Sequence, residues 1–394
     1  MFERNFKVIG ISDSRQQWCS PEVTSIIKSG KVFSGGKRHH EIVAHLLPSD
    51  ATWIDITVPL ENVFKEYTRY TDIVVFASGD PLFFGYAVTL QREFPDAQID
   101  VFPAFNSLQL LAHKMMLSYS DMICVSVTGR PWKSLDVALM RNQPKIGILT
   151  DRKKGPAEIA ERMLNYGYDN YRMMVGECLG NSSETVRTLP LKQAVKTEFK
   201  NPNCVILQMS ENRERFFGIP ERMFSHLEGR NNMITKMPIR LLSLAMLDLF
   251  GKSTMWDVGF CTGSVSIEAK LQFPELDIVA FERREESRKL IEENSRRFGT
   301  PGIESVIADF MECDLSQYPA PDAVFIGGHG GRLDEMVERI SKFLRPGGCV
   351  VFNSVSDESC KTFMTAIEKC GRRIVESHRL HLDSYNPIMI MKAI

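Results

Sequence analysis

The residues between Trp256 and Ala269 carry the pattern with the most chemical content in this chain. A short apolar run there predicts a strand, Gly259 to Gly263 predict a tight turn, and the residues that follow have helical spacing. About 20 residues further on, a second apolar run from Asp277 to Phe281 ends in the acid Glu282. In an open parallel α/β sheet, this spacing brings the turn and the carboxylate together at the carboxyl ends of adjacent strands. There the acid can accept hydrogen bonds from ribose hydroxyls.

The turn differs from a dinucleotide-binding fingerprint in a way that bears on the ligand. A pyrophosphate requires a close approach to bare backbone at a helix N-terminus. Here three larger residues separate the two glycines, and no G-x-G-x-x-G can be written. The turn therefore favours a nucleoside without phosphates, such as S-adenosylmethionine, contacted by Gly259, Phe260, Cys261, Thr262, Gly263 and Glu282. The alternative is an ordinary strand-to-helix turn followed by a surface glutamate.

A second set of candidate binding residues lies in the first half of the chain. Gly79 relaxes a turn after a buried-type strand, Pro81 fixes its own φ, and Asp80 can accept hydrogen bonds from nearby amides. Taken alone, these residues fit a type I or II turn before a helix. Other loops are expected after predicted strands at one edge of the sheet, where α/β folds bind ligands, at Gly35–Glu41, Pro103–Ser107, Val127–Arg130 and Val175–Gly180.

Length and composition limit the class of protein. A chain of 394 residues predicts two domains, and a net charge of -1 with 25% charged residues argues against a nucleic-acid or membrane partner. Nine cysteines without a C-x-x-C pair fit free thiols in a reducing compartment better than disulfides or a metal site. The sequence has no apolar run long enough for a membrane span and no signal-peptide core. We therefore expect a cytoplasmic protein.

Short apolar runs alternate with helical patterns, which is typical of α/β architecture. The charged stretch Glu211–Asn232 interrupts this rhythm, so we predict domains at residues 1–212 and 213–394. Helices are expected at Ile239–Phe250 and Glu358–Cys370, and a closing antiparallel hairpin at Arg373–Leu382 and Pro387–Lys392, divided by residues 383–386. Other strands are expected at Val8–Ile11, Trp53–Thr57, Ile73–Ala77, Ile123–Val127, Ile146–Leu149, Val205–Met209 and Val350–Asn353.

Both halves resemble known methylases. The first half resembles the tetrapyrrole methylases of corrin synthesis, in Val8–Ile11, Gly36–His39, Gly79–Pro81 with Phe84–Gly85, Pro103–Ser107, Thr128–Arg130, Thr150–Asp151 and Gly176–Glu177. The second half resembles the Rossmann-like decarboxylating corrin methyltransferases, in Ile234–Lys236 with Arg240, Trp256–Gly259, Glu268, Ala308–Asp309, Phe325–Gly328 and Pro346–Gly348. In this order, over nearly the whole chain, they resemble the fused precorrin-6Y C5,15-methyltransferases (decarboxylating).

The resemblance implies a fold, a reaction and site residues. It implies a tetrapyrrole methylase domain that methylates C5, followed by a Rossmann-like class I methyltransferase domain that methylates C15 and decarboxylates the C12 acetate. S-adenosylmethionine is the implied methyl donor, and a tetrapyrrole of cobalamin biosynthesis is the implied substrate. We also expect a homo-oligomer and no metal cofactor. The further cofactor contacts that the matched motifs imply are Gly79, Asp80, Pro81, Ser107, Thr150, Thr235 and Asp309.

The implied substrate carries many carboxylates, which basic loop residues can pair with. Predicted substrate contacts are Lys37, Arg38, His39, Arg130 and Gly328, and further basic candidates are Lys236, Arg240 and Arg332. For catalysis the candidates are His329, Arg240 and Arg130; each also fits a purely structural or solvent-exposed role. The chain departs from the family pattern at Cys261, where a third glycine is usual, and also at Pro238 and His329.

Two other functions stay open at this point. A nicotinamide-dependent dehydrogenase would use the same α/β fold, but the missing G-x-G-x-x-G argues against it. A regulatory or scaffold protein would bind a nucleoside without turnover. Measuring cofactor binding distinguishes the first from a methyltransferase, and measuring turnover distinguishes the second.

Overall fold

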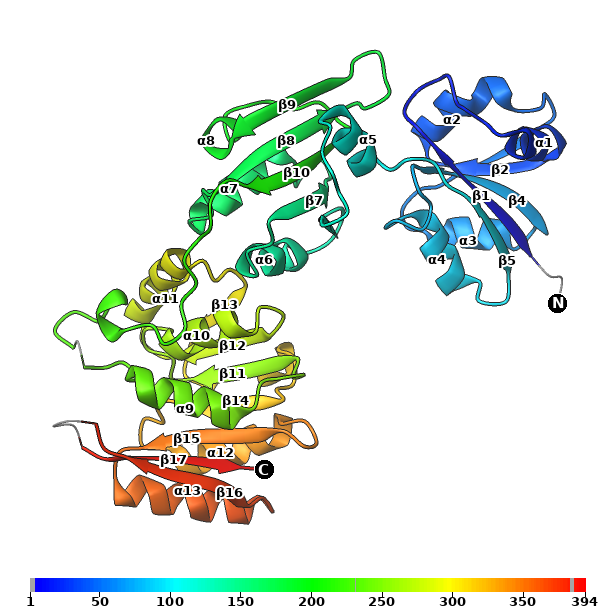
Figure 1. Ribbon diagram of the computed structural model, residues 1–394. Helices are drawn as coiled ribbons and strands as arrows, with labels where there is room; N and C mark the ends of the chain where they lie inside the picture. The colour runs from blue at the N-terminus through cyan, green and yellow to red at the C-terminus, as the bar shows by residue number, and fades with distance from the viewer. Residues whose placement is uncertain (1–3, 231, 383–385) are drawn as a thin grey trace. The chain divides into compact units, whose positions relative to one another are not determined.

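The structure is a computed structural model that describes residues 4–230, 232–382 and 386–394 (Figure 1). The chain forms two compact units. The first comprises the residues up to Pro131 together with Pro144–Glu161 and Asn170–Glu211; the second comprises Trp132–Gln143, Arg162–Asp169 and the chain from Asn212 onward. Two short segments from the first half of the sequence thus belong to the second compact unit. The compact units therefore differ from the domains predicted from the sequence, residues 1–212 and 213–394, which remain our proposal for the functional domains.

The first sheet of the first unit is fully parallel, with strand order β3-β2-β4-β1-β5. Its strands are β1 (Asn5–Ile11), β2 (Val32–Gly35), β3 (Thr52–Asp55), β4 (Asp72–Ser78) and β5 (Gln98–Phe102). Its helices are α1 (Pro21–Ser29), α2 (Lys37–Val43), α3 (Glu61–Tyr67) and α4 (Tyr86–Glu93), with a 3-10 turn at Ala44–Leu46. The three strands predicted here are confirmed. Gly35–Glu41, expected as a loop, instead ends β2 and begins α2.

The second sheet of the first unit is mostly antiparallel, with order β6-β7-β10-β8-β9 and one parallel pair, β6 with β7. The strands are β6 (Ile123–Ser126), β7 (Lys145–Leu149), β8 (Tyr171–Glu177), β9 (Thr185–Pro190) and β10 (Asn203–Met209). The helices that follow its strands in the sequence or precede them are α5 (Ser107–Lys114), α6 (Lys133–Met140), α7 (Pro156–Asn165) and α8 (Leu191–Ala194), of which α6 belongs to the second unit. Val175–Gly180, expected as a loop, begins inside β8.

The second unit is built on one seven-stranded sheet with order β13-β12-β11-β14-β15-β17-β16. Its strands are β11 (Thr254–Val258), β12 (Asp277–Glu282), β13 (Ile303–Ile307), β14 (Ala323–Ile326), β15 (Cys349–Ser354), β16 (Ile374–Leu380) and β17 (Ile388–Ala393). The first five are parallel, and the predicted closing hairpin β16–β17 is confirmed as the antiparallel edge. The predicted turn between its strands lies at residues 383–386, of which 383–385 fall outside the described residues.

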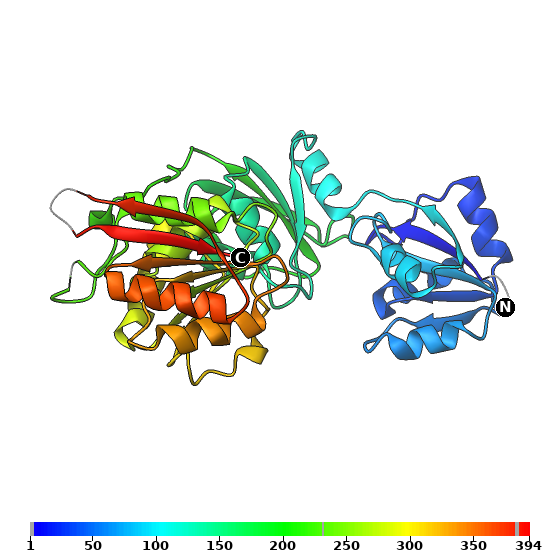
Figure 2. The ribbon, with the colours of Figure 1, turned by 90° about the horizontal axis from the view of Figure 1, so that it is seen from below.

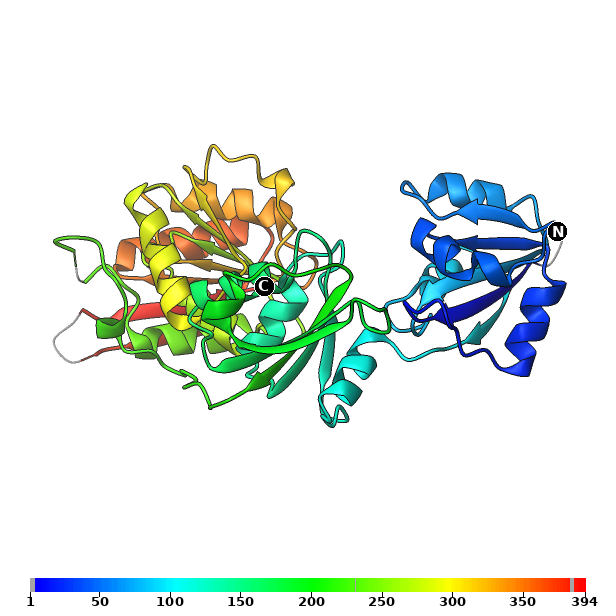
Figure 3. The same ribbon diagram turned by 90° about the horizontal axis from the view of Figure 1, so that it is seen from above.

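Helices cover both faces of this sheet, as a parallel sheet requires. They are α9 (Met237–Leu247), α10 (Ser264–Gln272), α11 (Glu286–Phe298), α12 (Leu333–Phe343) and α13 (Asp357–Lys369), with 3-10 turns at Glu221–Met223 and Leu315–Gln317. The ribbon shows helices on both sides of the sheet (Figures 2 and 3). Because side chains alternate along a strand, Trp256 and Val258 pack with α12 and α13, whereas Met255 packs with α9 and α10. The predicted α/β class is confirmed, and the rigid core holds the carboxyl ends of the parallel strands in fixed positions.

Candidate functional site

The carboxyl ends of the parallel strands in the second unit open onto one cavity of about 720 Å³. Loops after β11, β12, β13 and β14 line it, together with the chain before α9 and residues of β15 and the closing hairpin. Most residues predicted from the sequence for this unit meet there, namely Thr235, Lys236, Gly259, Phe260, Cys261, Thr262, Glu282, Asp309, Gly328, His329 and Arg332. The structure therefore gathers residues that are up to about a hundred positions apart in the sequence, as expected for a ligand site at a sheet edge.

Gly259 allows two loops to touch at the floor of this cavity. Its φ is +80°, and a Cβ atom built on it would lie 2.6 Å from the backbone nitrogen of Gly328 in the loop after β14. A side chain here would force the loops apart as well as strain the backbone. Gly263 does not line the cavity; it precedes α10 with a φ of +76° and packs against Ile291.

Cys261 occupies a backbone conformation that usually favours glycine. Its φ is +52°, and its thiol donates to the carbonyl of Met233 at 3.0 Å. Burial, with a smaller effect from the Glu282 charge, raises the pKa of the thiol to about 11, so it stays protonated and remains a donor. The chain thus tolerates a side chain at the position of the usual third glycine by tying it to the segment that precedes α9.

Glu282 is only 4% exposed, so it is not the surface glutamate that an ordinary strand-to-helix turn would have left there. One carboxylate oxygen accepts a hydrogen bond from the backbone nitrogen of Cys261 at 3.1 Å. The other accepts from the backbone nitrogens of Arg283 at 2.9 Å and Arg284 at 3.2 Å. The guanidinium of Arg284 also contacts both oxygens, at 3.1 and 3.2 Å. Three amides thus fix the carboxylate at the cavity wall; its contact with a ribose stays a prediction.

Asp257, just before the Gly259–Gly263 turn, and Thr262, within it, are two further buried polar residues. Asp257 is fully buried and accepts from the backbone nitrogen of Ser266 at 3.2 Å and from its hydroxyl at 2.6 Å, which anchors the start of α10. Burial raises the pKa of Asp257 to about 7, and the nearby Glu282 charge adds to this effect. Thr262 lines the cavity, and its buried hydroxyl has no hydrogen-bond partner in the described parts of the chain. An unpaired buried hydroxyl fits a site completed by a polar ligand.

The Gly327–Arg332 loop after β14 brings two predicted residues, the catalytic candidate His329 and the basic candidate Arg332, to another part of the cavity. The backbone nitrogen of Gly331 donates to His329 Nδ1 at 3.3 Å, so Nε2 carries the proton of the neutral ring. Burial lowers the pKa of His329, so at neutral pH the ring is neutral and offers one N–H. Arg332 pairs with Glu335, and both side chains are about half exposed.

Arg240, a candidate catalytic residue, lies in a buried ion pair. Its side chain is fully buried and pairs with the fully buried Glu268 at 3.1 Å. Its remaining nitrogens donate to the carbonyls of Thr235 and Ile219. The Glu268 carboxylate also accepts from the backbone of Gly218 and Ile219, so the pair joins α9 and α10 to the preceding segment. Arg240 is therefore held in a structural ion pair and is not part of the cavity lining, and its catalytic or substrate-binding role stays a prediction.

In the first unit, two groups of predicted loops come together. Ala104 donates its backbone N–H to the carbonyl of Gly79 at 3.2 Å, which joins the Gly79–Pro81 turn to the Pro103–Ser107 loop. Asp80 accepts from the backbone nitrogen of Leu82 at 2.9 Å, as its turn role predicts. Ser107 begins α5. The hydroxyl of Thr128 donates to the carbonyl of Thr150 at 3.0 Å, which joins the Val127–Arg130 loop to the Thr150–Asp151 segment.

The side chains of two predicted residues in these loops have defined partners. Thr150 donates its hydroxyl to Asn203, either to the backbone carbonyl at 2.6 Å or to the side-chain oxygen at 2.7 Å. The guanidinium of Arg130 lies 5.3 Å from the ring centre of Phe84, a residue with a φ of +53°. This cation–π contact connects the Arg130 loop with the Gly79–Gly85 loop.

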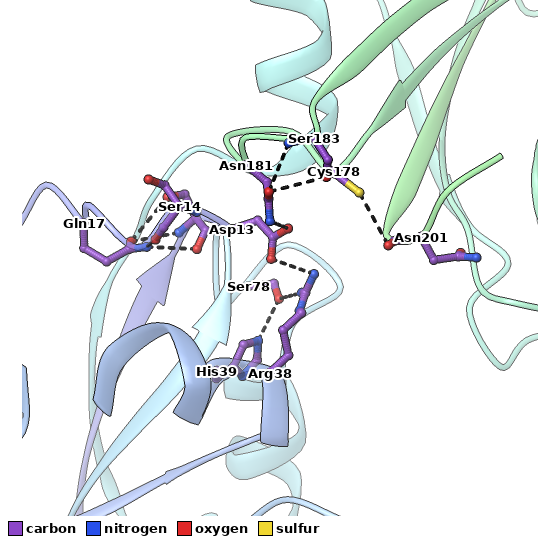
Figure 4. A network of polar contacts seen from close by, with 11 residues as sticks. Asp13, Ser14, Gln17, Arg38, His39, Ser78, Cys178, Asn181, Ser183 and Asn201 are labelled. Atoms are coloured by element: carbon purple, nitrogen blue, oxygen red, sulfur yellow. Dashed lines mark hydrogen bonds and ion pairs between the residues drawn. The ribbon is translucent and has the colours of Figure 1, made fainter. Parts of the chain in front are cut away.

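Around α2, a network of side chains surrounds the predicted substrate contacts (Figure 4). Arg38 pairs with Asp13 at 3.0 Å and donates to Ser78 at 3.1 Å, while Lys37 is exposed. Burial and the Arg38 charge lower the pKa of His39 to about 4. His39 is therefore neutral at pH 7, and its contact with the substrate stays a prediction.

The structure places several further residues at these sites that were not predicted from the sequence. Arg283 and Arg284 line the cavity directly after Glu282, and Asn353 lines it at the end of β15. A signal was available for all three: Arg283 and Arg284 follow the predicted acid Glu282, and Asn353 ends a predicted strand. Ser78 also ends a strand, but its contacts with α2, like the contact that Asp13 makes with Arg38, could not be read from the sequence because α2 is distant in the sequence.

Comparison with known proteins identifies the family. Residues 8–195 match the tetrapyrrole (corrin/porphyrin) methylases, and residues 226–393 match the precorrin methyltransferase domain. A precorrin-6Y C(5,15)-methyltransferase [decarboxylating] from Sinorhizobium sp is 32% identical over 357 residues, which is 89% of this chain and 84% of that protein. The chain belongs to this family. It is therefore a methyltransferase, and the dehydrogenase and non-catalytic scaffold alternatives are wrong.

Two single-function relatives from Salmonella typhimurium are similar to parts of this methyltransferase. A cobalt-precorrin-6B C(15)-methyltransferase (decarboxylating) is 35% identical over 41% of this chain and 83% of its own length. A cobalt-precorrin-7 C(5)-methyltransferase is 29% identical over 51% of this chain and 97% of its own length.

In the residues that the structure describes, no helix is long and apolar enough to cross a membrane.

Proposed function

We propose that this methyltransferase methylates C5 and C15 of a precorrin-6 type tetrapyrrole and removes the carboxyl group of the C12 acetate. The product is then a precorrin-8 type intermediate of cobalamin biosynthesis. The observation that supports this most directly is the order of the two family matches, residues 8–195 and 226–393, in one chain similar to a C(5,15)-methyltransferase over most of its length. A homo-oligomeric state and a cytoplasmic location stay predictions.

We assign C5 methylation to residues 1–212, and C15 methylation and decarboxylation to residues 213–394. Supporting this division, one relative is named for C(5) methylation alone and another for C(15) methylation with decarboxylation alone. The first family match lies wholly within the proposed first domain and the second within the other. Each domain then needs its own methyl-donor site.

The donor we propose at both sites is S-adenosylmethionine, which supplies an electrophilic methyl group when bound. The cavity of the second unit fits such a nucleoside, because Glu282 presents a buried carboxylate, Thr262 an unpaired buried hydroxyl and Gly259 an approach free of side chains. Glu282 would accept hydrogen bonds from the ribose hydroxyls and share its oxygens with Arg284. In the first unit, the Gly79–Pro81 turn, Ser107 and Thr150 would border the donor.

The chemistry assigned to the protein is mainly positioning. Methyl transfer from a sulfonium to a carbon requires donor and acceptor in line, and holding them so can remove several kcal/mol from the barrier. For decarboxylation, the conjugated tetrapyrrole accepts the electron pair, so the protein must orient the acetate. We propose that the N–H at His329 Nε2 and the guanidinium of Arg332 contact the acetate or a neighbouring carboxylate, since both residues line the cavity.

Variants of the full chain test this division. The full chain is required because α6 belongs to the second unit, where Lys133 pairs with Asp277 at 2.6 Å, so a cut at residue 212 would remove a structural element. Asp80→Ala should reduce C5 methylation, whereas Glu282→Ala should reduce C15 methylation. Mass spectrometry of products formed from labelled S-adenosylmethionine, with metal-free and cobalt-loaded substrates, counts methyl groups and lost CO2. If Asp80→Ala abolishes decarboxylation in a folded protein supplied with the C5-methylated intermediate, the division is wrong.

A further inference from the structure

Ser78 has a position at the first sheet that its sequence context does not reveal. It is the last residue of β4 and directly precedes the Gly79–Pro81 turn. Its hydroxyl oxygen lies 2.9 Å from His39 Nε2 and 3.1 Å from Nη2 of Arg38 (Figure 4). Which of these groups donates decides what Ser78 can offer to a ligand.

The hydrogen bond from Gly36 fixes the tautomer of His39. The backbone nitrogen of Gly36 lies 3.2 Å from His39 Nδ1, and a backbone N–H can only donate, so Nδ1 is unprotonated. Burial and the Arg38 charge keep the ring neutral at pH 7. The one ring proton is therefore on Nε2, and His39 donates to Ser78.

Arg38 is the second donor to the same hydroxyl. Its Nη1 pairs with Asp13 at 3.0 Å, and this contact directs Nη2 toward Ser78. On its other side, Asp13 accepts from Asn181 Nδ2 at 3.4 Å. A guanidinium has no acceptor, so both neighbours of the Ser78 oxygen donate to it.

A hydroxyl that accepts two hydrogen bonds has one hydrogen left, which must point away from both donors. With this assignment, no hydrogen bond within the described parts of the chain uses Ser78 as the donor. Ser78 is exposed, so its O–H faces the space beside the turn. The surrounding charge is suited to an anion: Lys37 is exposed, and the Arg38 side chain keeps 43% of its surface accessible despite the pairing with Asp13.

We propose that Ser78 is a binding residue of the first unit that donates its hydroxyl hydrogen to a carboxylate, with Lys37 and Arg38 supplying the positive charge beside it. His39 acts as a positioning residue, because its Nε2–H orients the Ser78 hydroxyl. This inference rests on the proposed C5-methylation site. Two molecules at that site carry the required group: the tetrapyrrole through its side chains and S-adenosylmethionine through its methionine carboxylate.

A pair of isosteric variants in the full chain tests the hydroxyl. Ser78→Thr keeps a hydroxyl and Ser78→Val replaces it with a methyl group of similar shape, so their comparison separates hydrogen bonding from packing. Calorimetry with S-adenosylhomocysteine measures donor binding, and the KM for C5 methylation measures tetrapyrrole binding. Because a hydrogen bond to a charged group is lost, we expect the valine variant to bind one of these ligands at least about tenfold more weakly than the threonine variant.

The pattern of weakening identifies the source of the carboxylate. A higher KM with unchanged S-adenosylhomocysteine binding assigns it to the tetrapyrrole, and weaker S-adenosylhomocysteine binding assigns it to the donor. If both constants agree within about twofold between the two variants, Ser78 is not a ligand donor and the inference is overturned. C15 methylation by the same chain is the internal control for folding. Absence of C5 methylation in the unmodified protein would instead refute the proposed function.

Discussion

The two units hold their polar groups in different ways at the sites proposed for the same methyl donor. In the second unit, three backbone amides fix the buried carboxylate of Glu282, and Gly259 lets two loops touch. In the first unit, the contacts around Ser78 run from side chain to side chain and are exposed. One site therefore depends on backbone geometry and burial, whereas the other depends on a solvent-accessible network.

This difference determines which changes each site tolerates. Backbone amides and buried pairs are weakly screened by salt, whereas partly exposed charge contacts such as Arg38 with Asp13 are screened more strongly and are individually weaker. We expect the second site to fail abruptly when a glycine or a buried charge changes. The first site should weaken gradually as single contacts are removed.

The largest effect is expected from breaking the buried pair of the second unit. Arg240→Ala leaves Glu268 buried without its cation, which should lower the free energy of unfolding by about 3–5 kcal/mol. Denaturant unfolding followed by circular dichroism measures this loss. Arg332→Ala is the control, because its pair with Glu335 is exposed and should contribute little to stability. A stable Arg240→Ala protein that has lost only activity would support the catalytic hypothesis for Arg240.

A smaller but still large effect is expected at Gly259. Gly259→Ala adds a Cβ atom that would lie 2.6 Å from Gly328 in a backbone conformation with positive φ, so donor binding in the second unit should weaken about a hundredfold. Calorimetry with S-adenosylhomocysteine measures this change. Gly251→Ala has a similar φ, +74°, with nothing within 4 Å of the added atom, and lies outside the cavity lining. Equal losses in both variants would show that backbone strain, and not loop contact, is responsible.

The carboxylate at the cavity wall should have the next largest effect. Glu282→Ala removes charge-assisted hydrogen bonding to the donor, which typically contributes about 1.5–3 kcal/mol, so the Kd should rise about ten- to a hundredfold. Glu285→Ala is the matched control, since its side chain is 72% exposed and pairs with Arg288 on the surface. An unchanged Kd in the Glu282→Ala protein would reduce this residue to an anchor for the turn.

The last prediction concerns the pH dependence of stability. Because burial raises the pKa of Asp257 to about 7, folding favours its protonated form. The contribution of Asp257 is complete below the pKa of the unfolded chain, about 4, and is lost as pH rises toward 7, by at most about 1.4 kcal/mol per pH unit. Hydrogen exchange in β11 and α10 at pH 5 and pH 7 measures this loss. Asp257→Asn cannot ionise, so an equal decline in that variant would assign the effect to another group.

Local sequence patterns predicted the second site well, because its geometry follows from spacing within one strand–turn–helix unit. Gly259 directly follows β11 and Glu282 ends the neighbouring parallel strand β12, and any sheet of that order brings them together. The state of Arg240 and His39 could not be read from the sequence, since burial by distant segments decides whether a basic residue is charged and accessible. Ser78 was missed for a related reason: its role depends on a tautomer set by Gly36 on another element.

The central claim, that each unit binds its own methyl donor, is tested most directly by the stoichiometry of S-adenosylhomocysteine binding to the full chain. Calorimetry should give two sites per chain, and Gly259→Ala should leave one of them with its affinity unchanged. One site in the unmodified chain, or the loss of both in the Gly259→Ala protein while it remains folded, would contradict the account.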